Sequence, residues 1–294
     1  MQTADVIARE SFTRLVDAPE VPAGIKSILF HVHNDGRLDD RLQVALSIAR
    51  AFGAHLHLMH VNPIEAYTIN DAFGTFVSAE IVKVLREEGE KLQAKIEQQL
   101  STEDVSWSYE EVTGTPVGHL IDRAALADLV MMGRGPEERE FGGPAVTMIG
   151  DLLAKVRTPL FIVGDKVREF DLFGRVIVAW NGSYEAANAL RGALPLLKLA
   201  SNVRLLSVDE PGDQRFPSTT ALEYLSRHGV HAELMQRITL GESAQDAILD
   251  QAEVDAASYV VMGGYTHSRA GEFLFGGVTR SFLKQCPVSL VMAH

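Results

Sequence analysis

Short apolar runs alternate with longer amphipathic segments along most of the chain. The runs are continuous and rich in Val, Ile, Leu and Met, a pattern that favours strands covered on both faces, as in a parallel sheet. The strands expected on this basis include residues 26–33, 55–61, 128–133, 175–181 and 203–208. The helices expected between them include residues 39–52, 80–100 and 185–199. This alternation predicts right-handed crossovers and an open, doubly wound α/β sheet.

The same order of elements occurs twice. The strand at 26–33, with the helix and the strand that follow it, has its counterpart in the strand at 175–181 and its successors. Near the end of each copy, Thr158–Val163 matches Cys286–Val291. The sequence therefore predicts two tandem domains that follow an N-terminal extension of open role. The predicted parts are the extension at 1–25, a first domain at 26–166 and a second domain at 173–294.

The first copy is longer in its middle than the second. The additional residues fall near 63–81, before the charged helix, and include the aromatic residues Tyr67, Phe73 and Phe76. Long connections are often functional, whereas others simply cover the fold. We expect this insertion to be either a lid or partner surface, or a cover for the edge of the sheet.

Composition excludes several classes of protein. The 294 residues contain 27 Lys and Arg against 39 Asp and Glu, a net charge of −12, which disfavours nucleic acid and anionic lipid as partners. Hydrophobic residues make up 46%, as in globular proteins. The single cysteine, Cys286, excludes an internal disulfide and fits a reducing compartment. No apolar run reaches the roughly 18–20 residues that span a bilayer, and the start is not a secretory signal, so we expect a cytoplasmic protein.

Two loops of the second half are candidates for ligand binding, because doubly wound sheets bind ligands at the carboxyl ends of their strands. The loop after the first strand contains Asn181 and Ser183, which are candidate helix caps. The loop after the fourth strand is rich in glycine, and Gly276-Gly277 begins a helical run with Thr279 in its first turn. Backbone N–H groups at a helix start attract phosphate, so this loop is a candidate phosphate site. The alternative is that its glycines only form tight turns.

As a set, these segments resemble the universal stress protein family, in its tandem form. The similarity is carried by Val176–Ser183, Val260–Gly263, Phe275–Thr279 and Pro287–Met292. It implies a five-stranded parallel sheet of strand order 3-2-1-4-5 in each half. Because members of the family dimerise through the last strand, it also implies that the two halves pack as an intramolecular pseudo-dimer. A further homodimer of such chains stays open.

The resemblance also implies a nucleotide site in the second half. Family members that bind ATP use a Gly-x2-Gly-x9-Gly-Ser/Thr motif and an acidic residue at the end of the first strand. Here Gly263 and Gly276 match two motif glycines, whereas Thr266, Gly277 and Asn181 depart from the pattern. The implied ligand is ATP with Mg²⁺, or another adenine nucleotide. The residues assigned to the site are Asn181, Gly182, Ser183, Val208, Met262, Gly263, Thr266, Gly276, Gly277, Val278 and Thr279.

The first half departs further from the motif. Pro136 stands at the second motif glycine, Met148-Ile149 at the third, and His33 at the acidic residue, so we expect this half to be a structural partner. The leading hypothesis is a stress-response binding or signalling module with an unidentified protein partner, favoured as a non-enzyme over a catalyst. The alternatives are a nucleotide-free interaction scaffold and a slow Mg²⁺-dependent ATPase.

The first half also carries an unusual set of histidines. Residues two apart on a strand share a face, so two adjacent strands could bring four imidazoles together as a metal site. The interpretation we favour is that each histidine packs separately, so no metal ligand is assigned. The four histidines are His31, His33, His55 and His57.

Overall fold

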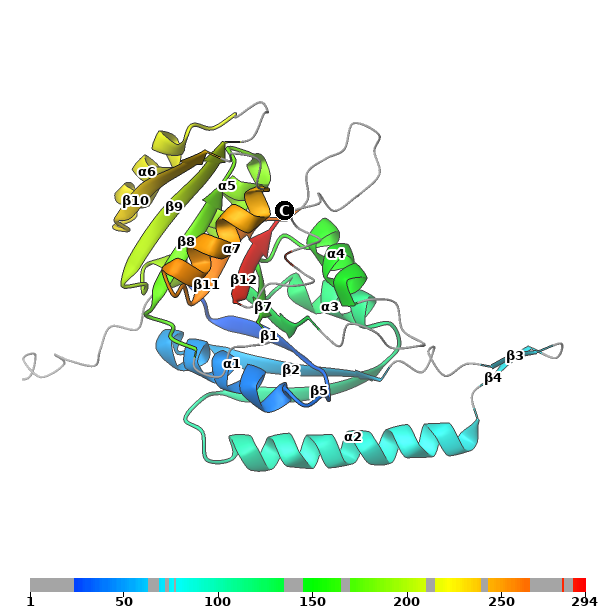
Figure 1. Ribbon diagram of the computed structural model, residues 1–294. Coiled ribbons are helices and arrows are strands. Elements are labelled where there is room, and N and C mark those ends of the chain that lie inside the picture. The colour runs from blue at the N-terminus through cyan, green and yellow to red at the C-terminus, as the bar shows by residue number, and fades with distance from the viewer. Residues whose placement is uncertain are drawn as a thin grey trace, which may run out of the picture.

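Ten strands of the computed structural model join into one continuous sheet that runs through both halves of the chain (Figure 1). The structure describes residues 24–62, 69–71, 74–76, 78–134, 145–164, 170–209, 215–238, 243–264, 282 and 288–294. The first half contributes β1 (Ser27–Val32), β2 (His55–Asn62), β5 (Trp107–Thr113), β6 (Leu129–Gly133) and β7 (Leu160–Val163). The second half contributes β8 (Arg175–Trp180), β9 (Asn202–Asp209), β10 (Ala232–Ile238), β11 (Tyr259–Gly263) and β12 (Ser289–Ala293).

The strand order is β10-β9-β8-β11-β12-β7-β6-β1-β2-β5. Numbered within its own half, each set of five strands has the order 3-2-1-4-5, which confirms the predicted topology. All neighbours within a half are parallel, whereas β12 and β7 pair antiparallel, with Val291 opposite Phe161. The last strands of the two halves therefore join the domains as an intramolecular pseudo-dimer, as expected.

Helices cover both faces of the sheet. One core lies under α1 (Leu38–Phe52), α2 (Ala79–Leu100), α5 (Tyr184–Leu197) and α6 (Ser218–Arg227). The other lies under α3 (Pro116–Ala124), α4 (Ala145–Lys155) and α7 (Ala244–Val254). Strand residues alternate between the cores, so that Ile28 and Phe30 join the first and Leu29 the second. Each such side chain stabilises the fold by about 1.5–3 kcal/mol when fully buried.

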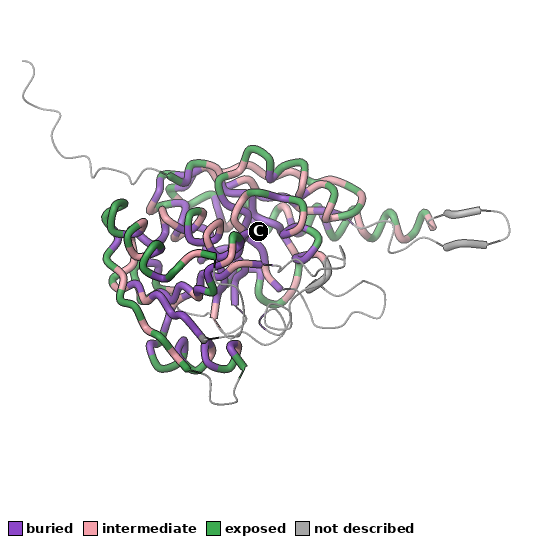
Figure 2. Tube along the Cα trace, turned by 90° about the horizontal axis from the view of Figure 1, so that it is seen from above, coloured by how far each residue is buried: buried purple, intermediate pink, exposed green. Residues whose placement is uncertain are grey.

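The extra length of the first half lies around α2. This helix has 22 residues, against 10 in α6, its counterpart in the second half. Its C-terminal part is buried through Leu92 and Ile96, whereas its N-terminal part projects and leaves Val84 56% exposed (Figure 2). Before it, β3 (Ile69–Asp71) and β4 (Gly74–Phe76) form a separate two-stranded sheet (Figure 1). The insertion predicted near 63–81 thus includes a hairpin that does not pair with the main sheet.

Two expectations concern residues that the structure leaves largely undescribed. The N-terminal extension lies outside the described residues up to residue 23, and so does Cys286. Within the described residues, no helix has both the length and the apolar character needed to cross a membrane.

Candidate functional site

The carboxyl ends of β8, β9 and β11 meet at one edge of the second half, because the three strands are parallel neighbours. The structure brings six of the predicted site residues to this edge. They are Asn181, Gly182, Ser183, Val208, Met262 and Gly263. The other predicted residues fall outside the described part of the chain. They are Thr266, Gly276, Gly277, Val278 and Thr279.

The loop between β8 and α5 is a tight, capped turn. The side-chain oxygen of Asn181 accepts a hydrogen bond from the backbone N–H of Ser183 at 3.2 Å, which fixes the turn. Gly182 has φ +73°, a conformation that favours glycine. The Ser183 hydroxyl then accepts from the backbone N–H of Ala186 at 3.1 Å and caps α5, as the sequence predicted. The exposed Asn181 side chain therefore lies next to a well-defined helix start.

The segment before α6 packs against this loop. The backbone N–H of Phe216 donates to the carbonyl of Gly182, and the indole N–H of Trp180 donates to the carbonyl of Phe216, both at 3.1 Å. The rings of Phe216 and Tyr184 meet edge to face at 5.1 Å, and the guanidinium of Arg215 lies 5.1 Å from the centre of the Tyr184 ring. Aromatic surface and a positive charge thus flank the loop, and the sequence analysis missed both.

Gly263 lets β11 end directly against the first turn of α5. A Cβ atom at this position would lie 2.7 Å from the backbone nitrogen of Ala186 and 2.8 Å from the carbonyl carbon of Glu185. Contacts this short to backbone atoms require the helix to move. The glycine therefore has a packing role at the strand end, apart from any role in binding. Beneath it, Val208 and Met262 belong to the buried core under α7.

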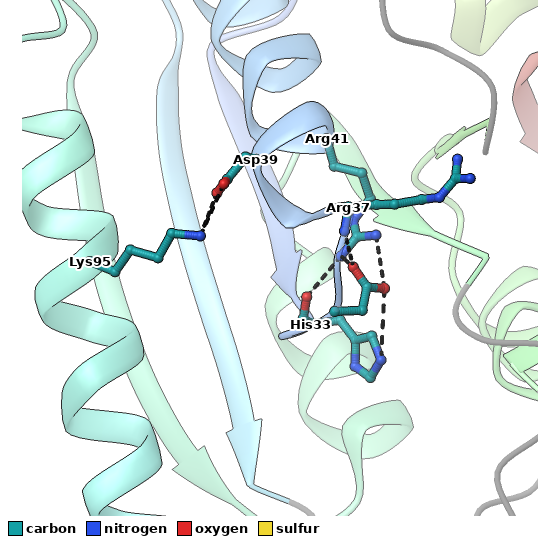
Figure 3. Close-up of polar contacts among 6 residues, drawn as sticks. His33, Arg37, Asp39, Arg41 and Lys95 are labelled. Carbon is teal, nitrogen blue, oxygen red and sulfur yellow. Dashed lines mark hydrogen bonds and ion pairs between the residues drawn. The ribbon is translucent and has the colours of Figure 1, made fainter.

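The equivalent edge of the first half is filled by the chain's own side chain. Gly133 ends β6 as Gly263 ends β11, but a Cβ atom on Gly133 would meet the side chain of Arg41, 2.7 Å from its Cδ. The Arg41 guanidinium binds both oxygens of Asp35, at 2.8 and 3.0 Å, and donates to the carbonyl of His33 at 2.8 Å (Figure 3). The Arg41 side chain is only 5% exposed. It occupies the space beside the strand end.

The surroundings of Asp35 at this edge favour its ionised form, and so the ion pair with Arg41. Burial alone would raise the pKa of Asp35, but the hydrogen bonds from Arg41 and from the backbone of Arg37 outweigh it and hold this pKa below 3.8. Burial, followed by the charges of His33 and Arg41, lowers the pKa of His31 to about 3. At neutral pH the Arg41–Asp35 pair is therefore charged, and His31 is neutral.

The different lengths of the two loops explain why sequence analysis did not predict the Arg41–Asp35 pair. Five residues, 33–37, separate β1 from α1, whereas three, 181–183, separate β8 from α5. The longer loop sets Asp35 two residues beyond His33, the position aligned with the family's acidic residue. A signal was present in the sequence. Arg41 falls between Leu38 and Leu42 on the stripe of α1 that faces the core, where an unpartnered arginine would be costly.

The four histidines considered as a metal cluster do not come together, so that hypothesis is wrong in its geometry. The strand register sets His31 beside Met59, while His57 turns to β5 and contacts the carboxylate of Glu110 at 2.9 Å. His55 contacts serine hydroxyls on β5 at 2.8 and 2.9 Å. The rings of His31 and His33 are neighbours, with centroids 6.3 Å apart, but His55 and His57 are engaged with partners on β5 instead. Across the described residues, no group of three or more His, Cys, Asp or Glu side chains is arranged to hold a metal ion.

Comparison with known proteins agrees with this architecture. The profile of the universal stress protein family matches residues 24–144 and 172–294. A universal stress protein from Archaeoglobus fulgidus DSM 4304 is 18% identical, with a TM-score of 0.70 over 91% of this chain and 97% of that one. A functionally unknown protein from Pseudomonas aeruginosa PAO1 is 15% identical, with a TM-score of 0.58 over 92% of each chain. At these identities the likeness shows the fold. No curated protein matched.

Proposed function

The chain belongs to the universal stress protein family, with two copies of the family domain in tandem, and on this premise we propose that it binds one adenine nucleotide, in its second half. We further propose that it acts as a binding module in the stress response rather than as an enzyme. The observation that supports a single site is the difference between the two strand-end glycines. Arg41 fills the space beside Gly133, whereas the loop beside Gly263 presents an exposed Asn181.

The described residues suit the base and ribose end of such a ligand. The Asn181 amide is a donor and an acceptor for ribose hydroxyls. Tyr184 is 56% exposed and offers aromatic surface that a base could contact. Arg215, beside Tyr184, adds a positive charge at this edge of an acidic protein. The phosphate role stays assigned to Gly276–Thr279 on the sequence motif alone.

The same residues favour binding over turnover. Phosphoryl transfer needs Mg²⁺ held near the phosphates and a positioned water or acceptor. Glu185, in the first turn of α5, is only 9% exposed and lies inside the helix packing. Its carboxylate is therefore poorly disposed to hold a metal over this edge. Mg²⁺ would accompany ATP here as a counterion of the phosphates, and its further ligands would be water.

Binding at this edge could act on a partner through α6. The loop 181–183 and the segment that precedes α6 are joined by the Phe216–Gly182 hydrogen bond. A nucleotide that contacts both sides would stabilise one arrangement of α6 relative to α5. Such a ligand changes partner affinity only if it binds two arrangements with different affinities. We therefore propose that the surface around α6 is where a partner protein detects the bound nucleotide.

The test is isothermal titration of nucleotide-stripped protein with ATP and Mg²⁺. We expect one site per chain, weakened about tenfold or more by Asn181→Leu, because that variant loses hydrogen bonds to the ligand. His33→Leu, at the equivalent position of the first half, is the matched control and should leave affinity unchanged. Asn181→Asp should retain binding.

Each other outcome has a definite meaning. Unchanged ATP affinity in Asn181→Leu, or an equal loss in His33→Leu, would contradict assignment to the second half. Absence of binding at millimolar ATP would contradict the nucleotide proposal and favour the interaction scaffold. Steady release of inorganic phosphate that depends on Mg²⁺ would contradict the proposal of a non-enzyme.

A further inference from the structure

A groove of about 520 Å³ lies where the two halves of the chain meet. Its volume falls within the range of sites for small ligands. It shares no lining residue with the loop 181–183, so it is separate from the proposed nucleotide edge. Among the residues that the structure describes, those lining the groove are Arg157, Asn188, Arg191, Gly192, Tyr224 and His294.

The fold builds this groove from both halves. The antiparallel pairing of β12 and β7 sets Met292 opposite Leu160, so the end of β12 lies beside the turn that contains Arg157. Helix α5 of the second half packs on the same turn. A Cβ atom on Gly192 would lie 2.6 Å from a side-chain carbon of Pro159, so the glycine allows this close contact between the halves.

Each half supplies one arginine to the groove, Arg157 from the first and Arg191 from the second. Neither forms an ion pair with any residue that the structure describes. The arginines of this protein that do form ion pairs include Arg41, Arg50, Arg123, Arg204, Arg227 and Arg237.

Two like charges that line one groove repel each other, and an anion between them would remove that repulsion. A guanidinium binds phosphate oxygens through paired, charge-assisted hydrogen bonds, and a phosphate group carries enough negative charge to match two arginines. The remaining lining is suited to a compact polar ligand. The Asn188 amide is held by donation to the backbone carbonyl of His294 at 3.1 Å, and Tyr224 adds an aromatic wall.

We propose that this groove is a second ligand site, which binds a small phosphate-bearing molecule between Arg157 and Arg191. The ligand bridges the two halves and stabilises their arrangement. It also lies near Gly264, the residue after the end of β11, since Nδ1 of His294 is 3.2 Å from the carbonyl of Gly264. A carbonyl only accepts, so His294 donates there and ties the groove to the residue after Gly263.

Inorganic pyrophosphate is the probe, titrated into full-length Gly276→Val protein so that the proposed nucleotide site does not compete. We expect binding that weakens about tenfold in Arg157→Gln and in Arg191→Gln, because each loses a charged hydrogen-bond donor. Arg227→Gln is the matched control, since Arg227 is exposed on α6 and paired with Glu223. It should leave binding unchanged.

A second readout is the melting temperature. Pyrophosphate should raise it in the Gly276→Val parent and in Arg227→Gln, and the rise should vanish in Arg157→Gln and Arg191→Gln. The arginines are exposed, so these variants should fold, as their melting in buffer checks. Equal binding by all variants, or none by the parent at millimolar pyrophosphate, would overturn the proposal. ATP titration of Arg157→Gln with intact Gly276 reports on the nucleotide site independently.

Discussion

The carboxyl edges of the two halves share one topology and differ in what lies beside the strand-end glycine. In the first half Gly133 faces the side chain of Arg41, and in the second half Gly263 faces the backbone of α5. The longer first loop, 33–37, provides Asp35 to hold the arginine, while the shorter loop, 181–183, draws the helix directly onto the strand. The two edges thus differ by two loop residues and one arginine: Arg41 fills the first edge, whereas the second leaves Asn181 exposed.

The two solutions also differ energetically. The first half holds the largely buried Arg41–Asp35 ion pair. Such a pair stabilises the fold little more than two apolar side chains would, but removing only one partner is costly because the other charge is left unpaired. The second half holds a helix cap and a backbone-to-backbone contact, in which there is no flexible side chain to give way. We therefore expect the second edge to tolerate added volume least, and the first to be most sensitive to loss of one charge.

Adding a methyl group at each strand-end glycine is expected to have the largest effect. Gly263→Ala should lower the free energy of unfolding by about 3 kcal/mol, because its Cβ meets backbone atoms of α5 at 2.7 Å. Gly133→Ala should cost less, about 1–2 kcal/mol, because Arg41 is a side chain that can shift. Urea denaturation measures both.

Gly36→Ala is the control for these glycine variants, since a Cβ there has nothing within 4 Å. It should leave stability nearly unchanged or raise it slightly, by up to about 1 kcal/mol. A larger loss in Gly133→Ala than in Gly263→Ala would contradict the comparison.

Breaking the ion pair of the first half should have the next largest effect. Arg41→Met should lower the free energy of unfolding by about 2–3 kcal/mol, because it leaves the half-buried Asp35 carboxylate without its partner. Adding Asp35→Asn should recover part of that loss. Arg123→Met, which removes a more exposed pair with Glu110, should cost at most about 1 kcal/mol.

The double-mutant cycle over Arg41 and Asp35, measured by urea denaturation, tests this directly. Additive losses would mean that the two side chains do not depend on each other, and the ion pair would then not be what holds Arg41 beside Gly133.

Much of the fold was predictable because it follows from patterns that are local in sequence. Buried strands are recognisable as continuous apolar runs. The strand order and the pairing of the last strands came from the family resemblance. The cap on α5 was predictable for the same reason, since Ser183 and the N–H it accepts from belong to residues close in sequence.

The parts that sequence analysis missed depend on distant segments or on register. Phe216, which lies between β9 and α6 in the sequence, donates its backbone N–H to the carbonyl of Gly182, more than thirty residues earlier. Arg41 fills the first edge only because the loop before it is longer. The histidines are separated by strand register, which periodicity alone does not fix. Candidate site residues beyond Gly264 stay predictions.

Acidification should lower the free energy of unfolding through His31, a buried residue of the first half. Its pKa is about 3 in the folded chain, mainly because of burial, against 6.5 in an ordinary environment. The unfolded chain therefore takes up a proton first as pH falls below 6.5, so acidification favours unfolding. From this group we expect a loss approaching about 1.4 kcal/mol per pH unit between pH 6 and 4.

Asp35 acts in a lower window, because its stabilising contribution is lost only as pH falls below 3.8 and through its depressed folded pKa. His31→Leu should therefore flatten the dependence of unfolding free energy on pH between 6 and 4, measured by urea denaturation at each pH. His231→Gln, at an exposed position of the second half, is the control and should keep the parental slope. An unchanged slope in His31→Leu would mean that the His31 imidazole takes up its proton at the same pH in the folded and unfolded chains. The account of a pKa lowered by burial would then be wrong.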